Sequence, residues 1–333
     1  MKTTPNSPLV TIAIPTYNRC SLLHGALESA LAQVGVDFEV LVCDNASDDG
    51  TEELLSQYGD PRLRIVRHAK NLGLIGNWNS CLGNARGDFL LMLSDDDCLM
   101  PTALMDLTAA YGLALGQGMK EADDSVAFAY GRCEFKHLGS GSVSLSAEAP
   151  AREQALEFQV GVLMGTRVSY PSATLLRCAD ARACGGYSRR FMAAIDSGMV
   201  FQIASRRACV AFTNRPTTRY TMHTTNFTSN IALPDLAATM AGLAKVAWLG
   251  AARSATTVPA QASRALRSAP AKAVADLICE RQRRGSIGTA AALRSLWELR
   301  SLFLSETSWV IGTRAAAKIL LRAWPRRIAG ASD

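Results

Sequence analysis

Three carboxylates stand side by side at Asp95-Asp96-Asp97, directly after the apolar run of residues 89–93. Adjacent carboxylates repel one another, so they need a compensating cation. Mg²⁺ takes oxygen ligands, usually one or two carboxylates together with the phosphates of a substrate. The triplet is therefore either a divalent-metal site or a solvated acidic turn. Its position at the end of so apolar a strand favours the metal site.

Two more polar segments follow apolar runs in the same way. Asp44 opens the segment 44–51 after the run 38–43, and the segment 15–19 follows the run 9–14, in which Pro15 is expected to end the strand. Asp44 can accept a hydrogen bond from a base N–H or a sugar hydroxyl, while Asp49 or Thr51 caps the next helix. Tyr17 can offer an aromatic face to a base.

The elements that must position these residues alternate along the chain. Apolar runs predict strands at 9–14, 38–43, 64–66 and 89–93. Helical periodicity predicts helices at 21–31 and 51–58, and residues 71–85 are expected to form a loop and a helix. Such alternation predicts a doubly wound α/β fold with a mostly parallel sheet and right-handed crossovers. Ligands of these sheets bind beyond the carboxyl ends of the strands, which is where the three polar segments fall.

These segments together resemble family 2 glycosyltransferases with the GT-A fold. The resemblance is strong over about residues 8–110 and weaker to about residue 230, and one residue differs, since Ser94 stands where many relatives have Asp. It rests on the order and spacing of Pro15-Thr16-Tyr17-Asn18, Asp44 to Thr51, Asn71-Leu72-Gly73, Gly87-Asp88, Ser94-Asp95-Asp96-Asp97 and Pro101.

The resemblance implies an inverting transfer of sugar from a nucleotide-diphosphate donor to an acceptor hydroxyl. Asp44 would bind the base, Thr16 and Tyr17 would line its pocket, and Asp95 would lie near the ribose. Asp96 would bind Mg²⁺ or Mn²⁺ directly. The same signature adds Pro15, Asn18 and Asn71 to the nucleotide-sugar site and Asp97 to the metal candidates.

Two residues further along the chain resemble the second half of such a site. Asp196 corresponds to the general base that deprotonates the acceptor, although Ile195 stands where many relatives have Glu or Asp. The alternative for Asp196 is an N-cap of the helix that follows. His223 corresponds to a histidine near the diphosphate, where it would bind metal or steady the leaving group; the alternative is a structural histidine.

Charge divides the chain near residue 234. Residues 1–234 hold 20 Lys and Arg against 23 Asp and Glu, whereas residues 235–333 hold 15 against 6. We therefore expect a catalytic domain at 1–234 and a basic helical region at 235–333. Arg314, Lys318 and Arg322 share one helix face, which suits either an anionic membrane surface or a helical hairpin packed on the catalytic domain with its charges in water.

Composition limits the remaining classes of function. No apolar run of signal-peptide length precedes the first expected strand, no apolar stretch reaches membrane-spanning length, and the nine cysteines form no CxxC pair. We expect a cytoplasmic enzyme, peripheral to the membrane at most, that builds a cell-surface polysaccharide or a glycolipid on a saccharide or lipid-linked acceptor. No basic and aromatic pattern indicates nucleic-acid binding. A nucleotidyltransferase and a non-catalytic nucleotide-sugar-binding protein are the alternatives.

Overall fold

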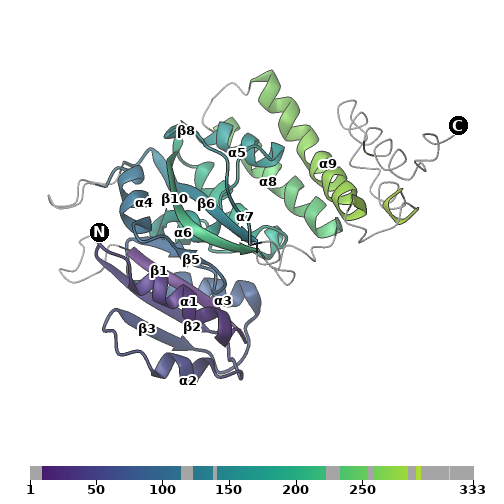
Figure 1. The fold of residues 1–333 in the computed structure, drawn as a ribbon. Helices are drawn as coiled ribbons and strands as arrows, with labels where there is room; N and C mark the ends of the chain where they lie inside the picture. Colours follow the sequence, from purple (N-terminus) through teal and green to yellow (C-terminus); the bar gives the residue numbers. More distant parts are fainter. Residues whose placement is uncertain are drawn as a thin grey trace, which may run out of the picture.

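A computed structural model describes residues 10–113, 123–137, 141–222, 233–253, 259–283, 290–293 and 315 of the chain. The predicted mixed α/β architecture with a mostly parallel central sheet is confirmed (Figure 1). The first half supplies four strands and three helices: β1 (Val10–Thr16), α1 (Cys20–Leu31), β2 (Phe38–Asp44), α2 (Thr51–Ser56), β3 (Leu63–Arg67), α3 (Gly73–Asn84) and β4 (Phe89–Met92). The four strands are parallel, in the order β3-β2-β1-β4, as the strand–helix alternation predicts.

The second half extends this sheet with strands of both directions. β9 pairs antiparallel with β4 and β6, whereas β10 pairs parallel with β6 and antiparallel with the short β5 and β8; β7 pairs antiparallel with β6. The strand bounds are β5 (Cys98–Leu99), β6 (Val126–His137), β7 (Val143–Leu145), β8 (Arg152–Gln154), β9 (Thr174–Arg177) and β10 (Cys209–Met222). The helices are α4 (Ala103–Tyr111), α5 (Ala155–Met164), η1 (Pro171–Ala173), α6 (Cys178–Ala183), η2 (Arg189–Phe191), α7 (Ile195–Ala204), α8 (Leu233–Arg253) and α9 (Ala260–Arg283).

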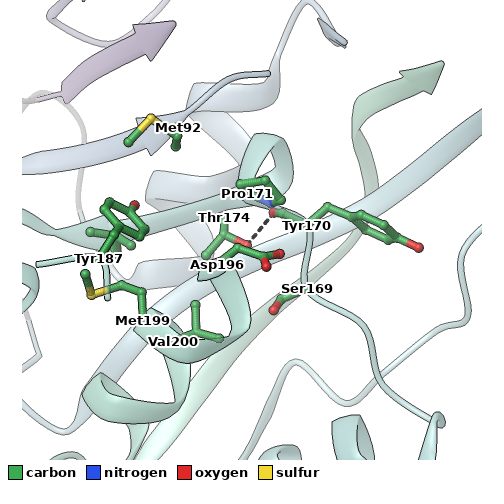
Figure 2. A pocket seen from close by; sticks show the side chains of 10 residues that line it. Met92, Ser169, Tyr170, Pro171, Thr174, Tyr187, Asp196, Met199 and Val200 are labelled. Atoms are coloured by element: carbon green, nitrogen blue, oxygen red, sulfur yellow. Dashed lines mark hydrogen bonds between the residues drawn. The ribbon is translucent and has the colours of Figure 1, made fainter. Parts of the chain in front are cut away.

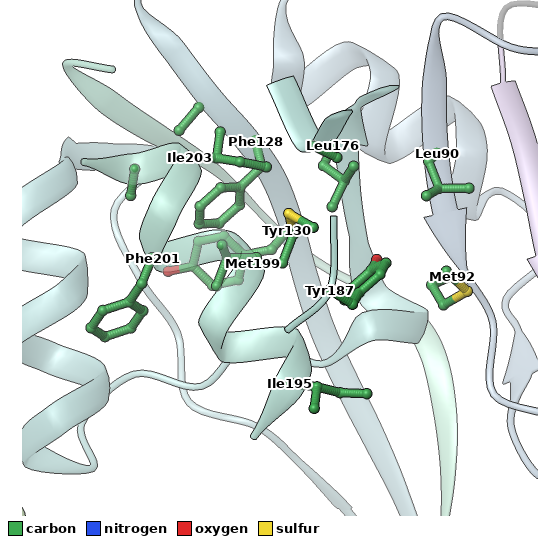
Figure 3. Close-up of a cluster of buried hydrophobic side chains, with 14 of the residues drawn as sticks. Leu90, Met92, Phe128, Tyr130, Leu176, Tyr187, Ile195, Met199, Phe201 and Ile203 are labelled. Atoms are coloured by element: carbon green, nitrogen blue, oxygen red, sulfur yellow. The ribbon is translucent and has the colours of Figure 1, made fainter. Parts of the chain in front are cut away.

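Helices cover the sheet on both faces, which buries alternate residues of each strand in different clusters. Ile12 and Ile14 of β1 pack with residues of α1 and α4, whereas Ala13 packs with residues of α3, α5 and α7. Figure 3 shows part of the second cluster, in which Phe128 and Met199 lie among other buried apolar side chains. Each fully buried side chain of this size stabilises the fold by about 1.5–3 kcal/mol.

Pro15 does not end the first strand, contrary to the expectation from sequence. β1 continues through Thr16, and Pro15 pairs with Cys43 of β2. The Ala13 carbonyl accepts from the Leu93 N–H on the β4 side, so Pro15, two residues on, faces that side as well. β4 has already ended at Met92, so the missing N–H of proline costs no ladder hydrogen bond.

The helices α8 and α9 pack against each other and against α5, and α8 also contacts α7. Leu243 and Ala247 of α8 and Leu266 of α9 join the buried cluster between the sheet and α7. Within the described residues, no helix is both long and apolar enough to cross a membrane. Arg314, Lys318 and Arg322 lie outside the described residues, and the division into two domains near residue 234 stays a prediction.

A glycine holds the loop before β4 against the backbone of β1. A Cβ atom on Gly87 would lie 2.5 Å from the Thr11 nitrogen and 2.7 Å from the Val10 carbonyl carbon, and neither backbone atom can move without disturbing the sheet. We expect Gly87→Ala to lower the free energy of unfolding by about 1–3 kcal/mol, measured by urea denaturation. Gly83→Ala is the matched control, because its Cβ meets nothing within 4 Å on helix α3 and should leave stability unchanged or raise it by about 1 kcal/mol. Equal effects of the two substitutions would contradict this account.

Candidate active site

A cleft of about 580 Å³ opens at the carboxyl ends of β1, β2 and β4. Residues of the first half of the chain line one part of it. The rest is lined by residues just before and at the start of η1, around the start of α7, and in β10. From the first half come Pro15, Thr16, Tyr17, Arg19, Asn45, Asn71, Gly73, Leu74, Asn77, Trp78, Ser94, Asp95 and Asp96. From the second half come Val168, Ser169, Tyr170, Pro171, Ala193, Ala194, Ile195, Asp196, Ser197 and Tyr220.

The three adjacent carboxylates point in different directions. Asp95 and Asp96 line the cleft, and both contact the Nη1 atom of Arg19, at 3.2 Å from Asp95 Oδ1 and 2.9 Å from Asp96 Oδ2. Asp95 Oδ2 also accepts from the Thr16 hydroxyl at 2.9 Å. Asp97 is buried and is not part of the cleft lining; its oxygens accept from the Ser172 hydroxyl at 2.6 Å and the Thr221 N–H at 3.3 Å.

Burial and the charges of neighbouring carboxylates raise the pKa of two members of the triplet, Asp95 and Asp97. Burial raises the pKa of Asp95 to about 6, an effect that the charge of Arg19 partly offsets and that of Asp96 reinforces. Burial likewise raises the pKa of Asp97 to about 7, against the hydrogen bond from Ser172. The oxygens of Asp97 accept from Ser172 and Thr221 and do not line the cleft, which suits a structural acceptor better than a cation ligand.

Asp95 and Asp96, which line the cleft, fit a divalent cation whose coordination is completed by the phosphates of a substrate. Within the described part of the chain, no group of three or more His, Cys, Asp and Glu side chains is arranged to hold a metal ion. Mg²⁺ needs no such cage, since one or two carboxylates together with substrate phosphates suffice. Asp95 and Asp96 are oxygen donors that already attract a cation, the Arg19 guanidinium. His223 lies outside the described residues.

Asp44 carries a buried oxygen without a hydrogen-bond partner. The residue ends β2 and is 1% exposed; its Oδ1 accepts from the Ser47 N–H at 3.0 Å, whereas Oδ2 accepts no hydrogen bond from any described residue. The nearest cation is Arg67, whose Nη1 lies 3.7 Å from that oxygen. A buried acceptor without a donor is costly, so this oxygen is suited to an N–H group of a ligand.

The loops around Asp44 are held by side-chain amides. The Asn45 amide donates to Asn71 Oδ1 at 2.8 Å, and Asn45 Oδ1 accepts from the Leu72 N–H. Asn18, at a φ of 51°, accepts from the Asp48 N–H and so joins the loops after β1 and β2. Asn71 therefore lines the cleft, whereas Asn18 and Asp44 are not among the residues that line it. The Tyr17 side chain is 45% exposed at the cleft, as an aromatic face for a base must be.

Asp196 does not cap a helix. α7 begins at Ile195, its N-cap position is Ala194, and no side chain caps it. Asp196 is half-buried in the first turn and lines both the large cleft and a small cavity of about 10 Å³ behind it. Figure 2 shows its carboxylate beside the hydrogen bond from Thr174 to the Tyr170 carbonyl, among mostly apolar neighbours. Burial raises the pKa of Asp196, and the Ser197 N–H partly offsets that effect.

The sequence analysis did not predict the contact between Arg19 and the Asp95–Asp96 pair, although the sequence contains a pattern that indicates it. Three adjacent carboxylates require a cation, and Arg19 ends the first of the three polar segments. Asn45, Asn77 and Ser172 were missed as well; the Asn77 amide donates to the Cys43 carbonyl at 2.9 Å below the cleft. Polar residues that hold neighbouring segments in place in this way cannot be told from ordinary helix and loop residues in the sequence.

Comparisons with known proteins point to one family. Residues 11–112 match the family model of glycosyl transferase family 2. The chain is 29% identical over 152 residues to the GalNAc(5)-diNAcBac-PP-undecaprenol beta-1,3-glucosyltransferase of Campylobacter jejuni, a match that covers 45% of this chain and 46% of the relative. The chain spans less than half the length of the curated relatives that it matches.

Solved structures of low sequence identity share the fold. S. aureus TarS 1–349 in complex with UDP-GlcNAc aligns with a TM-score of 0.64 at 16% identity, covering 93% of this chain and 88% of that TarS 1–349 chain. The mannosyltransferase PcManGT from Pyrobaculum calidifontis, in complex with GDP-Man and Mn²⁺, aligns with a TM-score of 0.51 at 18% identity, covering 96% and 87%. Both are similar to this chain in fold over most of its length.

Proposed function

Since residues 11–112 match the family model of glycosyl transferase family 2, we propose that the chain transfers a sugar from a nucleotide-diphosphate donor to an acceptor hydroxyl, with inversion at the anomeric carbon. The observation that carries the proposal is one cleft lined by two kinds of carboxylate. Asp95 and Asp96 come from the end of β4, and Asp196 comes from the first turn of α7.

The donor would occupy the part of the cleft formed by the first half of the chain. Asp44 would accept a ring N–H of the base, Tyr17 would lie against its face, and Thr16 and Asn71 would border the nucleoside. Asp96, with Asp95 beside it, would hold Mg²⁺ or Mn²⁺, which when bound stabilises the negative charge that develops on the departing diphosphate. The complex of PcManGT with GDP-Man and Mn²⁺ supports this choice of cation. Asp97 has less support as a ligand, because its oxygens accept from Ser172 and Thr221. His223 lies outside the described residues and stays a candidate on the resemblance alone.

Asp196 would serve as the general base. Its carboxylate takes the proton of the acceptor hydroxyl, the hydroxyl oxygen bonds to the anomeric carbon, and the bond from that carbon to the diphosphate breaks with its electron pair on the diphosphate. Attack from the face opposite to the leaving group inverts the anomeric centre, by analogy with hydrolases in which two groups flank the bond. A raised pKa suits a base, because a carboxylate of higher pKa accepts a proton more readily.

The acceptor would enter near the second-half residues of the cleft. The rings of Tyr170 and Tyr220 lie 5.2 Å apart there and offer apolar faces to a saccharide. The name of the Campylobacter jejuni relative contains a PP-undecaprenol-linked saccharide, and on that ground we extend the proposal to a lipid-linked acceptor. We also propose that the basic region 235–333 contacts an anionic membrane, which would place the protein at the inner face of the cell membrane.

Thermal unfolding with nucleotides tests the donor site first. We expect Mn²⁺ with UDP, dTDP or GDP to raise the melting temperature, by about 2–4 °C for each kcal/mol of binding energy. These bases offer a ring N–H to Asp44, whereas cytosine has none, so CDP is the matched control ligand. At least one of the three nucleotides should give a shift that requires Mn²⁺ and is lost in Asp96→Ala. No shift with any of them would contradict the proposed function.

A further inference from the structure

One guanidinium nitrogen joins both carboxylates of the proposed metal site. Arg19 stands just before α1, and its Nη1 contacts Asp95 at 3.2 Å and Asp96 at 2.9 Å. The Arg19 side chain is 33% exposed and lines the cleft, whereas the two carboxylate side chains are 9% exposed. Burial alone would lower the pKa of Arg19, but the charges of the two carboxylates outweigh it and raise that pKa.

The rest of the Arg19 guanidinium is available to a ligand. An arginine carries five N–H donors in a rigid fork, and among the guanidinium nitrogens of Arg19 only Nη1 donates a hydrogen bond to a described residue. The fork matches the oxygens of a phosphate, to which arginine binds with two parallel hydrogen bonds. Arg19 therefore stands where it can contact the carboxylate pair and, after a rotation of its side chain, an anionic group in the cleft.

We propose that Arg19 is an exchangeable counter-cation, which neutralises Asp95 and Asp96 in the empty cleft and turns to the diphosphate when the divalent cation and the nucleotide enter together. The inference rests on the proposed function of the cleft. A metal ion that arrives alone must displace a cation from Asp96 and leave the guanidinium without an anionic partner. A nucleoside diphosphate supplies that partner, so metal and nucleotide assist each other.

This exchange predicts a measurable coupling between the two ligands. By linkage, a nucleotide that tightens Mn²⁺ binding must itself bind more tightly with Mn²⁺ by the same factor, and couplings between ligands typically amount to about 5–150-fold. In the wild type, Mn²⁺ alone should bind weakly and UDP or GDP should enhance it. In Arg19→Gln, Mn²⁺ alone should bind about tenfold more tightly, and the enhancement by nucleotide should shrink by a similar factor.

Free Mn²⁺ can be titrated by electron paramagnetic resonance, with and without the nucleotide, in the absence of any sugar transfer. Arg62→Gln is the matched control, because it removes the same charge from an exposed pair with Asp60 outside the cleft. It should leave both Mn²⁺ affinities unchanged. If circular dichroism shows that Arg19→Gln does not fold, Arg19→Met keeps a long side chain at the site and carries the same expectation.

Three results would overturn the exchange. Unchanged affinity for Mn²⁺ alone in the Arg19 variants would mean that the guanidinium does not compete for the site. If the Arg19 variants bind Mn²⁺ more tightly by the same factor with and without nucleotide, the arginine only repels the metal and does not move. The ratio of the Mn²⁺ affinities with and without nucleotide would then be the same as in the wild type. Absence of Mn²⁺ binding in every variant, even with UDP, dTDP or GDP, would overturn the proposed function as well, which separates the two failures.

Discussion

Asp96→Asn should reduce turnover of the sugar donor by about 10³-fold while the protein remains folded. Asp96 lines the cleft and contacts the guanidinium of Arg19, whereas Asp95 also accepts from the Thr16 hydroxyl and Asp97 accepts from Ser172, so Asp96 is the carboxylate best placed to serve a ligand. An amide of the same shape keeps the packing but loses the negative charge that a divalent cation requires. The rate of donor hydrolysis without acceptor measures the effect before the acceptor is identified.

Asp97→Asn is the matched control within the same triplet. Asp97 is turned away from the cleft towards Ser172 and Thr221, and a pKa near 7 means that the neutral form is already well populated at neutral pH. The neutral amide therefore resembles a state that the wild type adopts, and donor turnover should stay within about tenfold of the wild type. A loss as large as that of Asp96→Asn would show that Asp97 acts on the ligand, and our division of roles would be wrong.

The first half of the fold was predictable because its strands are buried on both faces. Central parallel strands appear in a sequence as continuous apolar runs, and 38–43 and 89–93 differ from β2 and β4 by a single residue at one end. The second half gives no such signal. β10 runs from Cys209 to Met222 with register shifts around Pro216, and a proline between polar residues looks like a loop in the sequence.

The site was predictable wherever a strand end alone places a residue. Thr16 ends β1, Asp95 and Asp96 follow β4, and all three line the cleft on that account. The pairing of Arg19 with the carboxylates joins residues 76 and 77 positions apart and depends on where α1 begins beside the end of β4. The Asp97 side chain points to Ser172, which lies in η1 just before β9. No sequence pattern specifies that β9 lies between β4 and β6 in the sheet.

Asp196→Asn should lower donor turnover and transfer by about 10²–10⁴-fold, the usual contribution of a general base. A base must be ionised to accept a proton, and burial raises the pKa of Asp196 above the ordinary carboxyl value of 3.8. The wild-type rate should therefore rise with pH through that raised pKa and level off above it. Initial rates across the acidic and neutral range, at saturating donor and Mn²⁺, should show this limb in the wild type and lack it in Asp196→Asn.

Binding and turnover must respond differently if Asp196 is the base. Donor binding uses the first-half residues, so Asp196→Asn should keep the metal-dependent thermal shift with nucleotide that Asp96→Asn loses. Ser197→Ala is the matched control, because Ser197 also lines the cleft beside Asp196 but carries no carboxylate, and its turnover should stay near that of the wild type. If Asp196→Asn keeps wild-type turnover with an unchanged acidic limb, the proton goes to another group. If it loses nucleotide binding together with turnover, Asp196 shapes the cleft instead of accepting the proton, because a base is needed only after the donor has bound.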